Sequence, residues 1–126
     1  PFYAAPYWFK AKLDAQGNAI GLEPIATGSP EFLKANPSSL AYAAPVEQFL
    51  ATWKFGQWNT FRIRCEGKYP YLTSWINGVK IMEWQEKEVR HPAKGGIALQ
   101  VHGGGDHTKE FVRYRNIQVK RLEPKN

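Results

Sequence analysis

The sequence predicts an all-β protein, an antiparallel β-sandwich or jelly roll, with one or two short helices in its N-terminal half. From about residue 58 onward, short segments alternate apolar and polar residues, as strands with one buried face do. The dipeptide Asn77-Gly78 separates two of these segments, and Asn-Gly is typical of a type I′ hairpin turn. An aromatic content of 14% supplies large side chains for a packed core.

The N-terminal part is predicted to be less regular, because residues 1–57 hold most of the nine prolines. We expect one strand over Tyr7–Leu13, ended by a turn at residues 14–18. Ser29-Pro30 resembles a helix start, and Pro37 leaves room for only about two turns. A second short helix is predicted over Pro45–Phe55. The apolar residues that recur there with helical spacing are Val46, Phe49, Leu50 and Trp53.

The C-terminal part is predicted to be a series of strands. They are Thr60–Glu66, the hairpin Tyr71–Ile76 and Val79–Trp84, Gly96–His102, and Phe111–Leu122. In the last segment the apolar residues change parity near Arg115-Asn116, and a β-bulge there would keep one face apolar.

Length and composition limit the possible classes. We expect a single domain over residues 1–126, with an irregular arm rich in Pro and aromatic residues over 1–57 and a strand-rich part over 58–122. The sequence contains no stretch of 18 apolar residues, so we predict no transmembrane helix. The net charge of +6 comes from Lys and Arg spread along the chain, so we predict no nucleic-acid partner. Cys65 is the only cysteine, and its place in the apolar phase predicts a small core residue.

The strongest candidate for a functional site is the pair Gln100 and His102. Both lie on the polar side of the strand predicted over Gly96–His102, about 7 Å apart by the strand rise. Glycines on both sides of this strand leave room for a ligand. Asp106 and His107 follow on a Gly-rich loop at the same end and are predicted as further contacts. The alternative is that His102 is structural and ties this loop to the sheet.

No cofactor motif is present in the sequence. The three histidines, His91, His102 and His107, match no known spacing of metal ligands. The sequence therefore predicts no cofactor and leaves a divalent metal open.

Four motifs occur in a fixed order along the chain. They are GQWNTFRI at 56–63, WINGV at 75–79, GIALQVHG at 96–103 and VRYRNI at 112–117. Together they resemble the C-terminal half of the 3-keto-disaccharide hydrolase domain family, over about residues 56–122. The resemblance implies a concanavalin-like jelly roll, and a periplasmic or secreted bacterial protein that cleaves 3-keto-glycosides by hydrolysis or by elimination and hydration.

The resemblance also implies roles for particular residues. Oxidation at C3 acidifies the neighbouring C–H, so the reaction needs a base and an electrophile near the ketone. It implies that His102 is the base or a metal ligand and that Gln100 is an orienting amide. An aromatic platform for the sugar would come from Trp75 or Trp84. The arginines on one strand face, Arg62 and Arg64, would bind hydroxyls or stabilise enolate charge.

The N-terminal part shows no clear counterpart of the family's first strands. We therefore expect a fold that is completed by further N-terminal strands or by another protein subunit, since open sheet edges are unfavourable. Two further functions stay open beside the enzyme. One is a lectin-like sugar binder without catalysis, and the other is a structural subunit of a larger assembly.

Overall fold

The computed structural model describes residues 7, 9–25, 39–89, 92, 94–100 and 111–123. Its contacts divide the chain into two compact units, Pro1–His91 and Pro92–Asn126. Within the described ranges, every helix and strand belongs to the first unit.

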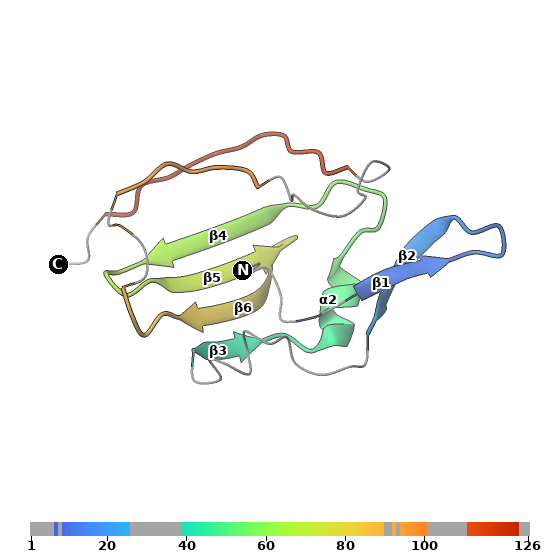
Figure 1. Cartoon of the computed structure of the whole chain (residues 1–126), viewed down its shortest axis with the longest axis horizontal. Helices are drawn as coiled ribbons and strands as arrows, with labels where there is room; N and C mark the ends of the chain where they lie inside the picture. The colour runs from blue at the N-terminus through green and yellow to red at the C-terminus, as the bar shows by residue number, and fades with distance from the viewer. Residues whose placement is uncertain are drawn as a thin grey trace. The chain divides into compact units, whose positions relative to one another are not determined.

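The main feature of the first unit is a four-stranded antiparallel sheet in the order β3-β6-β5-β4 (Figure 1). Its strands are β3 (Leu40–Ala43), β4 (Phe61–Glu66), β5 (Tyr71–Ile76) and β6 (Val79–Gln85). The predicted strand at 60–66 and the predicted hairpin are therefore confirmed. Strand β3 was not predicted from the sequence.

The β5–β6 hairpin turns at Asn77-Gly78, where both residues have positive φ, 49° and 84°. This is the backbone conformation of a type I′ turn, and Asn and Gly adopt it at low cost. The Asn77 side chain also joins three segments. Its Oδ1 accepts a hydrogen bond from the Thr60 N–H, and its Nδ2 donates to the Thr52 carbonyl and to Asn59 Oδ1.

The hairpin contains a register shift that decides which side chains share a face. Ile76 pairs with Val79, as a two-residue turn requires, but Ser74 pairs with Met82. Strand β6 therefore carries one extra residue at Ile81, which is fully buried with 0% of its surface exposed. Compared with a regular ladder, such a bulge places every later residue of its strand on the opposite face of the sheet.

The sheet has one polar and one apolar face. Trp75 of β5 lies opposite Arg62 and Lys80, which places all three on the face that we call the polar face. Leu72 lies three residues before Trp75 and opposite Trp84, so both belong to the other face, the apolar face.

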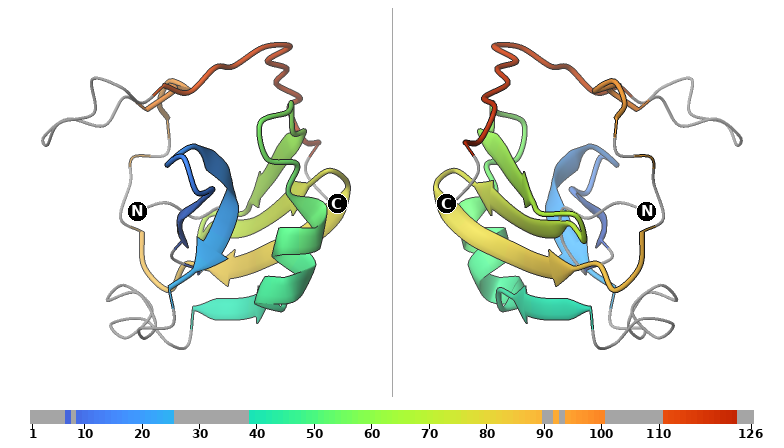
Figure 2. Two further views of the ribbon diagram at one scale, coloured as in Figure 1. Left: turned by 90° about the vertical axis from the view of Figure 1, so that its right-hand side faces the viewer. Right: turned by 90° about the vertical axis from the view of Figure 1, so that its left-hand side faces the viewer.

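The core lies on the apolar side and at the turn end of the hairpin. One cluster is formed by Met82 and Trp84 with Leu40 and Leu72 packed against them. A second cluster contains Ala44, Phe49, Ile76 and Ile81. Phe49 comes from helix α2 (Val46–Thr52), which confirms the helix predicted within 45–55. Figure 2 shows this helix beside the sheet.

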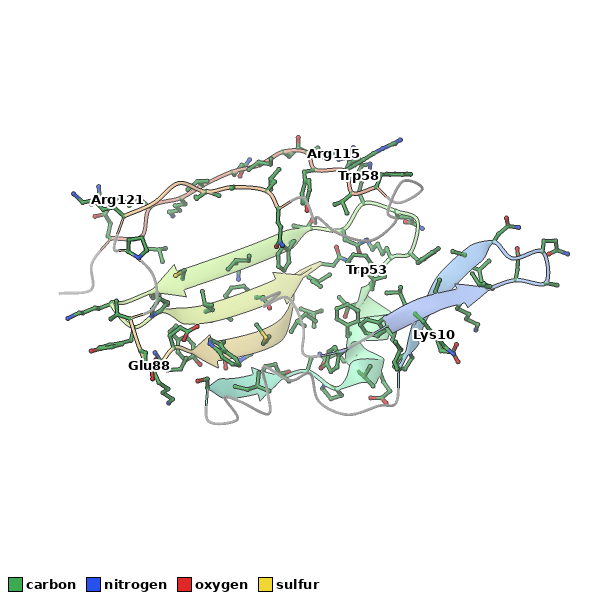
Figure 3. The ribbon with its side chains drawn as sticks, in the orientation of Figure 1. Lys10, Trp53, Trp58, Glu88, Arg115 and Arg121 are labelled. Carbon is green, nitrogen blue, oxygen red and sulfur yellow. The ribbon has the colours of Figure 1, made fainter. Side chains whose placement is uncertain are left out.

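A second, two-stranded sheet pairs β1 (Phe9–Leu13) with β2 (Ala19–Pro24). The predicted N-terminal strand and the turn after it are confirmed, whereas β2 was not predicted. The hairpin extends beyond α2 and carries Lys10, whose ammonium lies 3.3 Å from the Glu23 carboxylate (Figures 1 and 3).

Aromatic stacking anchors this hairpin to the core. The ring of Phe9 stacks on Phe49 at a centroid distance of 4.9 Å, and Phe49 stacks on Trp53 at 6.0 Å. Trp53 is the residue that ends α2, and Figure 3 shows it beside the helix. Tyr7 packs against both phenylalanines. Burial, with smaller contributions from Tyr42 and Glu47, raises the pKa of its hydroxyl to about 12.

The turn between β1 and β2 is built around the Asp14 carboxylate. It accepts hydrogen bonds from the Asn18 side chain, at 3.0 Å, and from the backbone N–H groups of Asn18 and Gln16, at 2.8 and 2.9 Å. Because these bonds favour the charged form, led by that of the Asn18 side chain, the pKa of Asp14 lies below its ordinary value of 3.8.

We expect Asn18→Ala to raise the Asp14 pKa toward 3.8, as measured by an NMR pH titration of the Asp14 carboxyl carbon. A lowered native pKa means that this turn stabilises the fold above the unfolded pKa and loses that contribution as the pH falls through the folded pKa. Gln16→Ala is the control, because its backbone N–H remains in place and the Asp14 pKa should stay low. An equal shift in both variants would contradict this account.

The second unit corrects two of the predictions. Residues 96–100 of the strand predicted over Gly96–His102, and the whole of Phe111–Leu122, form no strand. A strand requires a hydrogen-bonded partner, and alternation in one segment says nothing about that partner. Asn116 has a positive φ of 54°, at the place where the apolar residues change parity.

The structure also tests the prediction that Cys65 is a core residue. Cys65 is exposed, not a core residue, because the apolar face of β4 lacks a covering element among the described residues of its unit. Phe61 and Ile63 on the same face are likewise 48% and 59% exposed.

The helix predicted after Ser29 lies outside the described residues. In the described part of the chain, which is mostly β with one short helix, no helix has the length and hydropathy to cross a bilayer.

Candidate functional site

The polar face gathers side chains from three adjacent strands. Arginines come from β4, aromatic and hydroxyl residues from β5, and a charged pair from β6. They are Arg62, Arg64, Tyr71, Thr73, Trp75, Lys80 and Glu83. The hairpin register brings them side by side, since directly opposite residues lie about 5 Å apart.

Arg62 and Trp75 form the closest aromatic contact of this face. They are direct cross-strand partners, and the guanidinium carbon of Arg62 lies 3.9 Å from the centroid of the indole ring. At this distance the cation is attracted to the face of the ring. Arg62 is exposed and Trp75 is half-buried. The pair therefore presents an oriented guanidinium to solvent.

Glu83 is the centre of a second group of contacts. Its Oε1 lies 3.1 Å from the Lys80 ammonium, and it accepts a hydrogen bond from the Tyr71 hydroxyl. Burial, the Glu83 charge and this hydrogen bond raise the pKa of Tyr71, while Lys80 acts in the opposite direction. Tyr71 thus stays protonated at neutral pH and is a hydrogen-bond donor. The Lys80 ammonium also lies 4.6 Å from the ring centroid of Tyr42.

A third contact neutralises the other arginine. The Arg64 guanidinium lies 2.7 Å from the Glu66 carboxylate, in a charge-assisted hydrogen bond on the surface. The described salt bridges of this face, Arg64–Glu66 and Lys80–Glu83, do not include Arg62.

The structure separates the two tryptophans that the sequence suggested as a sugar platform. Trp75 lies on the polar face with Arg62 and Arg64, as required for a shared site. Trp84 lies on the apolar face and is only 3% exposed, and its indole N–H donates to Glu86 Oε1 at 3.1 Å. Trp84 is thus a core residue in this fold, and we assign no sugar contact to it.

The residues predicted in the C-terminal unit are only partly described. Gln100 is exposed. His102, Asp106 and His107 lie outside the described residues, as does His91. Their roles stay predictions from the sequence.

Glu83 and Tyr71 were not identified as site residues from the sequence. Counting residues from the Asn77-Gly78 turn would place Glu83 opposite Leu72, whereas the bulge at Ile81 places it opposite Thr73. The signal that could have found it is the strong apolar character of both Ile81 and Met82, two adjacent residues that are both buried.

The described residues contain no group of three His, Cys, Asp or Glu side chains suited to holding a metal ion. All three histidines of the chain lie in the remaining part.

A comparison with known families completes the description of the site. The model of the family described as 3-keto-alpha-glucoside-1,2-lyase-like domain matches residues 25–120. The match is longer than the resemblance seen in the motifs, because it extends into the N-terminal half as far as residue 25 and includes α2 and all four strands of the main sheet. Searches of curated proteins and of solved structures gave no match. The family prediction is confirmed, and the chain belongs to the 3-keto-alpha-glucoside-1,2-lyase-like domain family.

Proposed function

We propose that this protein binds and cleaves a 3-keto-glycoside, and that the sugar contacts the polar face of the main sheet. The observation that supports this is the Arg62 guanidinium over Trp75, on the same face as the Tyr71 hydroxyl, whose oxygen can accept a hydrogen bond while its proton is donated to Glu83. Sugar-binding surfaces combine aromatic rings with fixed hydrogen-bonding groups of this kind. Membership of a 3-keto-alpha-glucoside-1,2-lyase-like family supports a 3-keto-glucoside as the proposed class of substrate.

The chemistry of this substrate sets what the protein has to supply. A ketone at C3 acidifies the C–H bond at C2, so cleavage by elimination needs a base for that proton and donors for the ketone oxygen. We propose His102 as the base and Gln100 as the amide that orients the substrate. These two assignments rest on the motif at 96–103 through which the sequence resembles the family, and they are made independently of the polar face.

We expect His102→Ala to lower kcat on a 3-keto-α-glucoside about 10²- to 10⁴-fold, because general-base catalysis contributes that much. The measurement is release of the aglycone followed by chromatography. His91→Ala is the matched control and should keep the wild-type rate. Full activity of His102→Ala would contradict its role as base.

The same experiment separates the enzyme from its alternative. Binding of the 3-keto-α-glucoside by the wild-type chain without turnover would favour a lectin-like module that uses the polar face alone. Absence of both binding and turnover would overturn the proposed function and leave a structural role.

A further inference from the structure

We propose that Arg62, held on the ring of Trp75, is the receptor for a carboxylate of the sugar, so that the polar face takes acidic glycosides in preference to neutral ones. This inference rests on the proposed function in one respect, namely that the sugar contacts the polar face. It adds the substrate class and the residue that selects it.

The charges of the face support a negatively charged ligand. Among its described residues, three cations (Arg62, Arg64 and Lys80) face two carboxylates. Arg64 is paired with Glu66 and Lys80 with Glu83, at 2.7 and 3.1 Å. The remaining cation of the face is Arg62, and one carboxylate on the ligand would balance it.

The geometry of Arg62 suits a carboxylate in particular. The guanidinium carbon lies over the indole at 3.9 Å from the ring centroid, and a guanidinium stacked on an aromatic face leaves the N–H groups, which lie in its plane, available at the edge. Two of these N–H groups match the spacing of two carboxylate oxygens, in a bidentate pair. Because Trp75 already orients the group, less conformational entropy is lost when a ligand binds.

The same contact disfavours a neutral sugar stacked on Trp75. The indole has a cation as its cross-strand neighbour on each side, Arg62 from β4 and Lys80 from β6. The Arg62 guanidinium covers one ring face. A ligand approaching the covered face of the ring therefore meets the Arg62 guanidinium before the indole. In this arrangement Trp75 is a positioning residue for Arg62.

The test compares methyl α-glucuronide with methyl α-glucoside, which differ only in a carboxylate or a hydroxymethyl group at C5. We expect the wild-type chain to bind the glucuronide about fivefold more tightly at low salt, as an exposed ion pair allows, and to lose the preference at high salt. Affinities come from ligand-observed NMR titration, which applies equally to variants that lack the Trp75 indole.

Arg62→Gln should equalise the two affinities, mainly by lowering that for the glucuronide. Trp75→Leu should reduce the preference although Arg62 is still present, which a simple surface charge would not do. The matched control is Arg113→Gln, since Arg113 also stacks on an aromatic ring, Phe111, at 4.7 Å, and it should keep the full preference.

Several results would overturn the inference. They are equal affinities of the wild type for the two sugars, a preference for the glucuronide that survives Arg62→Gln, and failure of both sugars to bind. Displacement of the glucuronide by an equal concentration of acetate would also overturn it, because it would show an anion site without sugar selectivity. Cleavage of a 3-keto-α-glucoside without a preference for the glucuronide would refute this inference alone. A preference for the glucuronide without cleavage would refute the proposed function alone.

Discussion

Trp84→Ala is expected to lower the free energy of unfolding by about 3–5 kcal/mol, the cost of removing a fully packed aromatic side chain. Trp84 is 3% exposed and packs with Met82, Leu40 and Leu72 on the apolar face. Its removal leaves a cavity between β3, β5 and β6 and takes away the hydrogen bond to Glu86. Urea denaturation measures the change as a lower midpoint with an unchanged slope.

Two further variants make this prediction specific. Trp84→Phe keeps most of the packing and loses the indole N–H, so we expect a loss of only about 1–2 kcal/mol. Trp75→Ala removes the same side chain from the polar face, where it is half-buried, and should cost about 1 kcal/mol. Equal destabilisation by Trp84→Ala and Trp75→Ala would contradict the assignment of the two residues to opposite faces.

The second large effect is expected at the hairpin turn. Asn77→Ala should destabilise the fold by about 2–4 kcal/mol, because it removes three side-chain hydrogen bonds and because Ala tolerates a positive φ less well than Asn does. The lost bonds connect β4, α2 and the loop between them through Thr60, Thr52 and Asn59. The φ of 49° adds the backbone contribution. The same urea experiment measures it.

Asn77→Gly separates the two contributions. Glycine tolerates the positive φ but also lacks the amide, so Asn77→Gly should be destabilised by about 1 kcal/mol less than Asn77→Ala. If Asn77→Gly were as stable as the wild type, the hydrogen bonds of Asn77 would contribute nothing, and the network would not hold α2 to the hairpin.

Local patterns were sufficient for the elements with a strong local signal. The Asn77-Gly78 turn, the strand at Phe61–Glu66 and the helix at Val46–Thr52 were predicted from turn chemistry, period-two alternation and helical spacing. Each of these signals comes from residues close together in the chain. Strands β2 and β3 were missed because Ala19–Pro24 and Leu40–Ala43 lack clear alternation, so their strand character depends on the partners β1 and β6.

The candidate site depended more strongly on tertiary structure. A regular ladder counted from the turn would place Trp84 opposite Tyr71, on the polar side with Trp75. The single extra residue at Ile81 instead places Trp84 in the core and Glu83 beside Thr73. A bulge changes the register by one residue, and with a period of two that exchanges the faces of all the residues beyond it.

The amino-acid sequence by itself determined the family, the mostly β character, the hairpin turn, and the shared face of Arg62 and Arg64, because these depend on residue types and on spacing within one segment. Only the tertiary structure decided which strands pair, which tryptophan is buried and which arginine forms a salt bridge with Glu66. The physical reason is that hydrogen-bonded ladders, salt bridges and ring stacking join residues from different strands, and alternation along one strand carries no information on its neighbour.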